Sequence, residues 1–264
     1  MPLAIPGAPA ALVIAHPGHE LRVYGWLQLV SPLVFVLTDG SGRSGQSRVG
    51  STTKLLAQTG AQPGDIYARL TDLEVYTALL DHDFALFISL AEELAEVLIR
   101  GRMQYVVGDA AEGYNPAHDV CRLVINTAVD MAKQKGGWLV ANCDFSLVGR
   151  PDTCPEELRP RAIRLQLDDT AFARKRAAAR GYAELAREVA DTLVSIGEEA
   201  FRVECLRPVD SRAASGALAE EPPFYEWYGE QQVAAGYYKS VLRYREHVAP
   251  LAEVLRRCVA GNRL

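Results

Sequence analysis

Short hydrophobic runs alternate with longer amphipathic stretches over the first 150 residues of the chain. Runs that lack alternating polar positions are typical of parallel strands covered on both faces. The longer stretches carry apolar residues at helical spacing, as crossover helices do. The pattern therefore predicts an α/β fold with a mostly parallel sheet. Strands are expected at residues 11–15, 33–38, 104–108 and 138–142, and helices at 19–29, 71–80, 83–101 and 116–135.

The helix at 116–135 has the clearest boundaries in the chain. Asn115 has a side chain suited to the N-cap, and Pro116 suits the first helical position because it needs no backbone hydrogen bond there. Gly136 and Gly137 end the pattern. His118 is therefore expected in the first turn of a helix that follows a strand.

The last third of the chain is richer in helical and aromatic segments. It predicts a long amphipathic helix at 171–197, a loop at 211–221 and a helix at 239–258. We interpret residues 1–264 as a single domain, in which 151–264 forms a cap that completes a core at 10–150.

An aromatic cluster follows the predicted loop at 211–221. Tyr225, Trp227 and Tyr228 could stack on a sugar ring or could belong to the hydrophobic core. The cluster is also compatible with a homo-oligomer.

Composition narrows the classes of partner. A net charge of −5 provides no basic patch for nucleic acid or anionic lipid, so a small-molecule substrate is expected. No apolar run approaches the roughly 20 residues that span a bilayer, and no basic, apolar leader begins the chain. Five scattered cysteines favour reduced thiols over a disulfide framework. We therefore expect a cytoplasmic protein that does not enter a membrane.

Three of the five histidines follow predicted strands. His16 comes directly after the first strand, His19 lies in the following turn, and His118 follows the strand at 104–108. Because the carboxyl ends of parallel strands open into one crevice, the three rings are expected to converge. His82 and His247 lie in charged helical segments and are expected on the surface or in packing contacts.

Three histidines are a suitable ligand set for a hydrolytic metal such as Zn²⁺. A catalytic zinc site uses three protein ligands and leaves one position open. The ion makes bound water more acidic and polarises a scissile carbonyl. The alternative is that His16 and His118 are hydrogen-bonded structural residues near helix N-termini.

A loop rich in Gly and Ser follows the second predicted strand, at residues 38–48. It is expected either to connect two elements or to bind substrate over the same strand ends. Asp39 and Arg48 lie at its two ends. The loop is not a phosphate-binding P-loop, because no Gly-Lys-Ser/Thr closes it.

The segment Ala15-His16-Pro17-Gly18-His19-Glu20 resembles the Ala-His-Pro-Asp-Asp-Glu signature of the PIG-L/LmbE-like deacetylases. The segment Asn115-Pro116-Ala117-His118 resembles the second signature of that family, His-Pro-Asp-His. Thr38-Asp39-Gly40 is also similar to the family segment after the second strand. The resemblance covers about residues 10–140. It implies a Rossmann-like fold that binds zinc and removes N-acetyl groups from amino sugars.

The resemblance places His16, His19 and His118 as metal ligands, with His19 in the place of an aspartate. Gly18 stands where the family has its general-base aspartate. Asn115 stands where it has a histidine that acts on the transition state. The ligand set is therefore retained, whereas the groups that move protons are not.

Other carboxylates could replace the lost base. Glu112 and Asp109 are the leading candidates, because Glu112 lies in the loop before His118 and Asp109 follows a strand. Arg48, Tyr114, Asn115 and Asp39 are candidate substrate contacts.

These observations favour a zinc-dependent amidohydrolase that removes an acyl group from an N-acylated amino sugar or its conjugate. One alternative is a non-catalytic relative that binds a sugar-like ligand or metal without turnover. Another is a metal-dependent enzyme of different chemistry.

Overall fold

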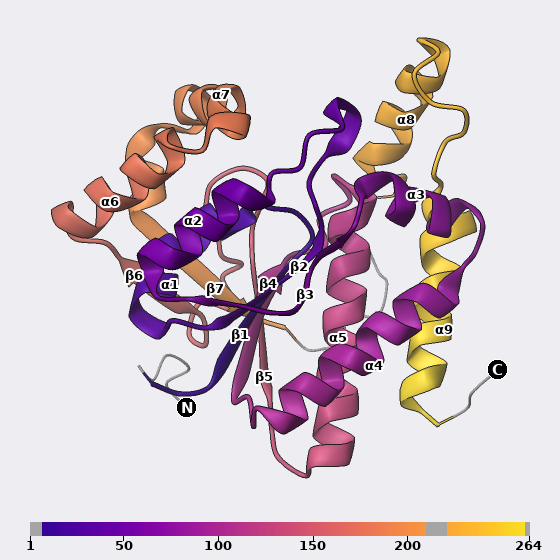
Figure 1. Ribbon diagram of the computed structural model, residues 1–264, viewed down its shortest axis with the longest axis horizontal. Coiled ribbons are helices and arrows are strands. Elements are labelled where there is room, and N and C mark those ends of the chain that lie inside the picture. The colour runs from indigo at the N-terminus through magenta and orange to yellow at the C-terminus, as the bar shows by residue number, and fades with distance from the viewer. Residues whose placement is uncertain (1–6, 210–220, 262–264) are drawn as a thin grey trace.

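The structure is a computed structural model that describes residues 7–209 and 221–261. Seven strands form one sheet in the order β3-β2-β1-β4-β5-β7-β6 (Figure 1). The strands are β1 (Ala10–Ile14), β2 (Leu33–Thr38), β3 (Gln62–Leu70), β4 (Tyr105–Asp109), β5 (Ala141–Phe145), β6 (Ile163–Gln166) and β7 (Val203–Pro208). The first five pair in parallel, whereas β7 runs antiparallel to β5 and to β6. This mostly parallel sheet with flanking helices is the Rossmann-like α/β fold that was expected.

Helices cover both faces of the sheet. One layer holds α1 (Tyr24–Val30), α2 (Val49–Thr59), α6 (Asp169–Arg180) and α7 (Ala186–Ile196). On the other side lie α3 (Asp72–Leu80), α4 (Phe84–Arg100), α5 (Pro116–Gly136), α8 (Phe224–Ala234) and α9 (Ala249–Val259) (Figure 1). Alternate residues of one strand join opposite cores, because successive side chains point to opposite faces. Thus Ala11 and Val13 pack beneath α4 and α5, whereas Leu12 and Ile14 pack beneath α1 and α2.

The predicted strands and most predicted helices of the first 150 residues are confirmed, with small shifts. The strand expected at 138–142 lies at 141–145, and the helix expected at 19–29 begins as a 3₁₀ turn over His19–Val23. Helix α3 begins with a capping box, in which Glu74 N donates to Thr71 Oγ1 and Thr71 N donates to Glu74 Oε2.

Two helix predictions for the last third were wrong in extent. The helix expected at 171–197 is broken after α6, where Gly181 and Tyr182 turn the chain before α7. Tyr182 is buried and its hydroxyl lies 2.7 Å from Thr52 Oγ1, so a core contact interrupts the helical pattern. The helix expected at 239–258 starts later, with a π-helical turn over Tyr244–Val248 followed by α9. The loop expected at 211–221 falls almost entirely outside the described residues.

A buried ion pair connects the later part of the chain to the first helix layer. Lys175 Nζ of α6 lies 2.8 Å from Glu204 Oε1 of β7, and both side chains are almost fully buried. The Glu204 carboxylate also accepts hydrogen bonds from the backbone of Gly25 and Trp26, each at 2.8 Å. This one carboxylate therefore holds α1, α6 and β7 together.

The sheet order creates a defined position for a ligand site. The chain leaves β1 toward β2 on one side, and later returns to place β4 on the other side of β1. In sheets of this kind, ligands bind outside the carboxyl ends of the strands at this switch point. The segments after β1 and β4 carry the three histidines that the sequence pattern selected.

Candidate functional site

The three histidines lie together at the switch point. Their ring centres are separated by 5.3 Å (His16 and His19), 5.1 Å (His16 and His118) and 4.6 Å (His19 and His118). His16 and His118 are buried and His19 is half-buried. Side chains from two distant segments thus form one compact cluster, called here the histidine cluster.

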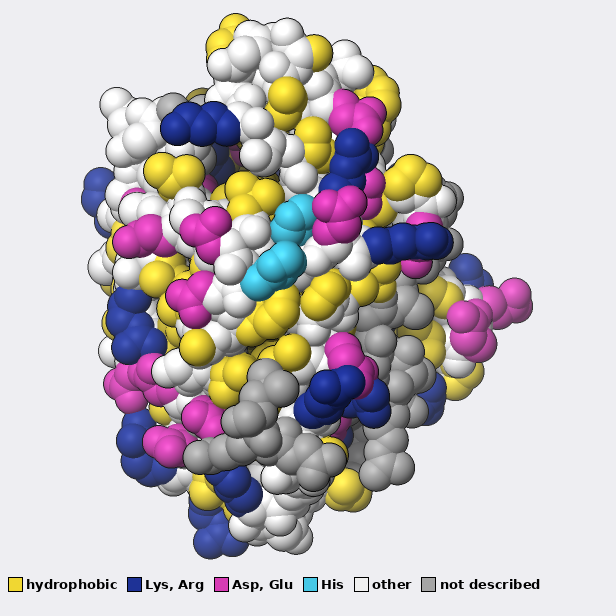
Figure 2. Space-filling model, turned by 90° about the vertical axis from the view of Figure 1, so that its right-hand side faces the viewer, with side chains coloured by type: hydrophobic (Ala, Val, Ile, Leu, Met, Phe, Trp, Pro, Cys, Tyr) yellow, Lys and Arg dark blue, Asp and Glu magenta, His cyan; other side chains and the backbone are white. Residues whose placement is uncertain are grey.

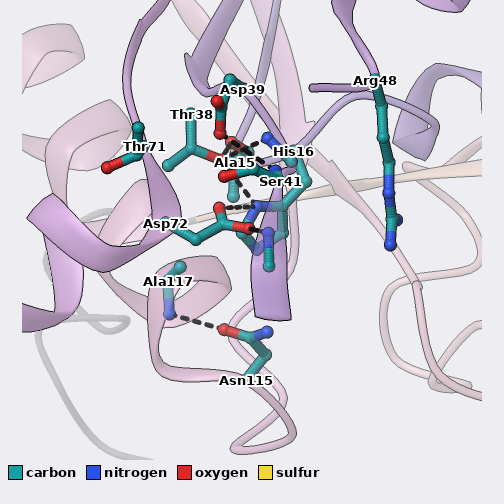
Figure 3. Close-up of polar contacts among 12 residues, drawn as sticks. Ala15, His16, Thr38, Asp39, Ser41, Arg48, Thr71, Asp72, Asn115 and Ala117 are labelled. Carbon is teal, nitrogen blue, oxygen red and sulfur yellow. Dashed lines mark hydrogen bonds and ion pairs between the residues drawn. The ribbon is translucent and has the colours of Figure 1, made fainter. Parts of the chain in front are cut away.

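A carboxylate contacts the Nδ1 atom of His16, and another contacts the Nδ1 atom of His19. His16 Nδ1 lies 2.8 Å from Thr38 Oγ1 and 3.0 Å from Asp72 Oδ1 (Figure 3). His19 Nδ1 lies 2.9 Å from Asp109 Oδ2. Metal-binding histidines use their second ring nitrogen in this way, because the partner fixes the tautomer and the orientation of the ring. This arrangement leaves Nε2 of both rings for another ligand.

The cluster contains buried nitrogen atoms whose hydrogen-bonding capacity is not used by the described residues. Neither His16 Nε2 nor His118 Nδ1 has a hydrogen bond among the described residues, although both atoms are buried. Burial and the two neighbouring imidazoles hold the pKa of His118 well below its usual range. The His118 ring is therefore neutral, and neutral imidazole is the form that binds metals.

The donor types and their spacing fit a divalent metal. Three imidazoles on one tetrahedral zinc, each bonded at about 2.0–2.1 Å, have ring centres roughly 5 Å apart. In the part of the chain that the structure describes, however, no group of three His, Cys, Asp or Glu side chains is already arranged as a metal site. A metal would therefore have to reorient the rings of the histidine cluster.

Asp72 was not singled out from the sequence, yet it is central to this site. Its Oδ2 accepts a hydrogen bond of 2.6 Å from Gly42 N, so it connects α3, the loop at 38–48 and His16. Burial alone would raise the pKa of Asp72, but the hydrogen bond and charge interaction with His16 hold it well below its usual range. Asp72 is therefore an anion next to the cluster.

The two carboxylates expected to act as bases have different surroundings. Asp109 is fully buried, and its Oδ2 accepts a hydrogen bond from Ala15 N at 2.7 Å besides contacting His19. Its Oδ1 has no hydrogen-bond partner among the described residues. The Glu112 carboxylate instead accepts hydrogen bonds from Ser146 Oγ and from the backbone of Leu147 and Val148. Glu112 therefore stabilises the loop after β5, whereas one oxygen of Asp109 makes no hydrogen bond to the described residues.

The four expected substrate contacts have different partners in the structure. Asp39 Oδ1 accepts a hydrogen bond from Ser41 N within its own turn. Arg48 lies apart from His16 (Figure 3), and its guanidinium pairs with Glu188 at 3.5 Å. Asn115 caps α5 by accepting a hydrogen bond from Ala117 N, and Tyr76 Oη lies 3.5 Å from its Oδ1.

Tyr114, the fourth expected contact, is half-exposed. Its ring stacks on Phe224 of α8 at 5.1 Å between ring centres. Only Asn115 and Tyr114 of the four are therefore next to the chain segment that carries His118.

At Gly18, where the resemblance led us to expect a general-base aspartate, another part of the chain fills the space. A Cβ atom on Gly18 would lie 2.3 Å from Leu185 Cδ1, and Gly18 has a φ of +107°. An aspartate there would need both a shift of Leu185 and a backbone conformation that side chains disfavour. Leu185 belongs to the turn between α6 and α7, so the sequence contains no local sign of this contact.

Burial also affects the acidic residues next to two of the histidines. It raises the pKa of Glu20 to about 7, and Glu20 Oε2 accepts a hydrogen bond from Gly18 N. It likewise raises the pKa of Asp119 to about 7, and Asp119 Oδ1 accepts hydrogen bonds from Glu112 N and Gly113 N. Both carboxylates hold the backbone that carries the histidines.

The sheet order and the histidine cluster define a Rossmann-like α/β protein with a polar site at its switch point. Neither models of known protein families nor curated proteins match the chain. In the described residues, no helix is long and apolar enough to cross a membrane.

Solved structures do resemble the chain. The A40926 pseudoaglycone deacetylase Dbv21 superposes with a TM-score of 0.52 and 18% identity, over 77% of this chain and 98% of that chain. A deacetylase in the biosynthesis pathway of teicoplanin has a TM-score of 0.50 and 14% identity, over 76% of this chain and 97% of that chain. At these identities the likeness establishes the fold.

Proposed function

We propose that the chain is a metal-dependent deacetylase that acts on an N-acylated amino sugar or its conjugate. The observation that carries the proposal is the histidine cluster, in which two rings contact carboxylates and two buried nitrogens lack hydrogen-bond partners among the described residues. The fold shared with two deacetylases, one of them acting on a pseudoaglycone, supports this class of reaction.

His16, His19 and His118 would hold the metal, which we take to be zinc or another divalent ion. Bound there, such an ion makes water more acidic and polarises the acyl carbonyl. Asp72 and Asp109 orient His16 and His19. Of the two candidate bases, Asp109 is favoured because it contacts His19, whereas the Glu112 carboxylate is engaged by the loop after β5. Glu112 is left with a supporting role.

A defined set of acylated sugars tests the activity. The zinc-loaded protein should release free amine from N-acetylglucosamine or from its glycosides, as measured by amine derivatisation and mass spectrometry. A chelator should abolish the release and added zinc should restore it. Release that is unaffected by the chelator would refute metal dependence.

The alternative is a protein that binds a sugar-like ligand or metal without turnover. The packing of Leu185 against Gly18 favours it, because this contact excludes the family's base from its usual place. It predicts stoichiometric metal and saturable sugar binding with no amine released from any acylated sugar in the set.

Replacing Asp72 by alanine tests how the histidine cluster is supported. Without its carboxylate partner the His16 ring can rotate, so we expect zinc affinity to fall by roughly 10–100-fold. Competition with a chromophoric chelator measures this affinity. Asp65→Ala is the matched control, because Asp65 is an exposed aspartate paired with Arg100. Equal affinities in the two variants would contradict the role of Asp72.

A further inference from the structure

Four aromatic side chains lie exposed in mutual contact beside the segment that carries His118. They are Tyr114, Phe224, Trp227 and Tyr228, with exposed fractions of 50%, 44%, 56% and 37%. Phe224 is the centre of this aromatic platform. Its ring centre lies 5.1 Å from Tyr114 in a nearly parallel stack, 5.5 Å from Trp227 and 6.2 Å from Tyr228. Figure 2 shows hydrophobic side chains exposed on the upper part of this side of the molecule, where α8 lies.

The platform is attached to the loop that leads to His118. Tyr225 N of α8 donates a hydrogen bond to Gly113 O, which anchors the helix on the loop before His118. Tyr114 precedes His118 by four residues, so their Cα atoms are at most about 14 Å apart. These two Cα atoms are therefore close enough for one small-molecule conjugate to span the distance between them.

The surface of α8 offers no free charge to a charged partner. The helix has two glutamates, Glu226 and Glu230, and both pair with Arg243, at 3.1 and 2.7 Å. Binding at the platform must therefore come from ring contact and from removal of apolar surface from water.

The size of the platform favours a small molecule over a second copy of the chain. Four rings of this kind, each about half-exposed, offer on the order of 400 Å². A stable dimer buries roughly 800 Å² from each partner. An area of this size suits a planar group of one or two rings, and flat rings in a near-parallel stack favour another flat ring.

We propose that the aromatic platform binds an aromatic group attached to the sugar of the substrate. The inference rests on the proposed function, which assigns the N-acylated sugar. It adds the chemical class of the group attached to that sugar, which does not react. The substrate is then an aryl conjugate of an N-acylated amino sugar, with the sugar at the histidine cluster and the aryl group on Phe224 and Trp227.

Binding measurements test the platform independently of turnover. The probes are 4-nitrophenyl N-acetyl-β-glucosaminide, its methyl and octyl counterparts, and the unacylated 4-nitrophenyl β-glucosaminide. By calorimetry, both aryl probes should bind about 10-fold more tightly than the methyl glycoside, as one added stacking contact implies. Trp227→Ala and Phe224→Ala should each remove most of this advantage and leave methyl glycoside binding unchanged.

Leu139→Ala is the control, because Leu139 is an exposed hydrophobic residue elsewhere on the surface. Thermal unfolding of each variant verifies that the fold is kept. Equal binding of aryl and methyl probes would overturn the proposal. Octyl binding as tight as aryl binding would also overturn it, because the platform would then be a general apolar surface. So would a dimer that either platform variant converts to a monomer.

Failure of the proposed function has a different signature. Aryl binding that depends on Trp227, without release of amine from the acylated probe, refutes the deacetylase activity and leaves the platform in place. Release of amine without any preference for aryl probes supports the deacetylase activity and refutes the role of the platform.

Discussion

Replacing His118 by alanine is expected to abolish stoichiometric zinc binding and deacetylation together. The ring lies within 4.6 to 5.1 Å of both other rings and is held neutral by burial, so it is the donor that completes the set. The loss of zinc affinity should exceed the roughly 10–100-fold that follows from removing an outer partner of a ligand. Metal content after dialysis and competition with a chromophoric chelator measure it.

His82→Ala is the matched control, because His82 is an exposed histidine on the turn between α3 and α4, away from the cluster. A His118→Ala protein that keeps one zinc per chain would refute the ligand set. If zinc is bound by the native chain and lost by the variant, but neither hydrolyses any acylated sugar, the cluster is a metal site in a protein without turnover.

Replacing Glu204 by alanine is expected to lower the free energy of unfolding by about 3–5 kcal/mol, because it leaves a buried charge without a partner. Lys175 is as deeply buried as Glu204, and the backbone groups of Gly25 and Trp26 would also lose their acceptor. Denaturant titration at neutral pH measures the change.

Glu199→Ala should have little effect, because Glu199 is exposed and pairs with Arg202 at the surface. The double variant Lys175→Met with Glu204→Ala should recover part of the lost stability, since it removes both charges. A loss of less than about 1 kcal/mol in Glu204→Ala would mean that the pair contributes little to holding α1, α6 and β7 together.

The sequence pattern predicted the strands around the site well, because these strands are buried on both faces and read as continuous apolar runs. Strand β3 was missed for the opposite reason. It contains Pro63, Gly64 and Asp65, lies at the edge of the sheet and pairs with β2 through irregular register. Edge strands tolerate such residues, so their composition is close to that of a loop.

The meeting of the three histidines follows from their positions after strands, and this was predictable. Their partners were not predictable in the same way. Asp72 appears in the sequence as part of a capped helix start, and nothing local relates it to His16, which lies 56 residues earlier. Glu112 was expected in proton transfer because it precedes His118. Only the fold shows that its oxygens are taken up by the loop after β5.

The contact between Gly18 and Leu185 limits which substitutions residue 18 can accept. Gaining an aspartate at residue 18 first would force a clash and a disfavoured backbone, whereas trimming Leu185 first would open the space. The order of the two changes therefore matters, because a shorter side chain at residue 185 has to be present before residue 18 can become aspartate without a clash. A carboxylate at residue 18 therefore requires a change at residue 185 as well, whatever chemistry the protein performs.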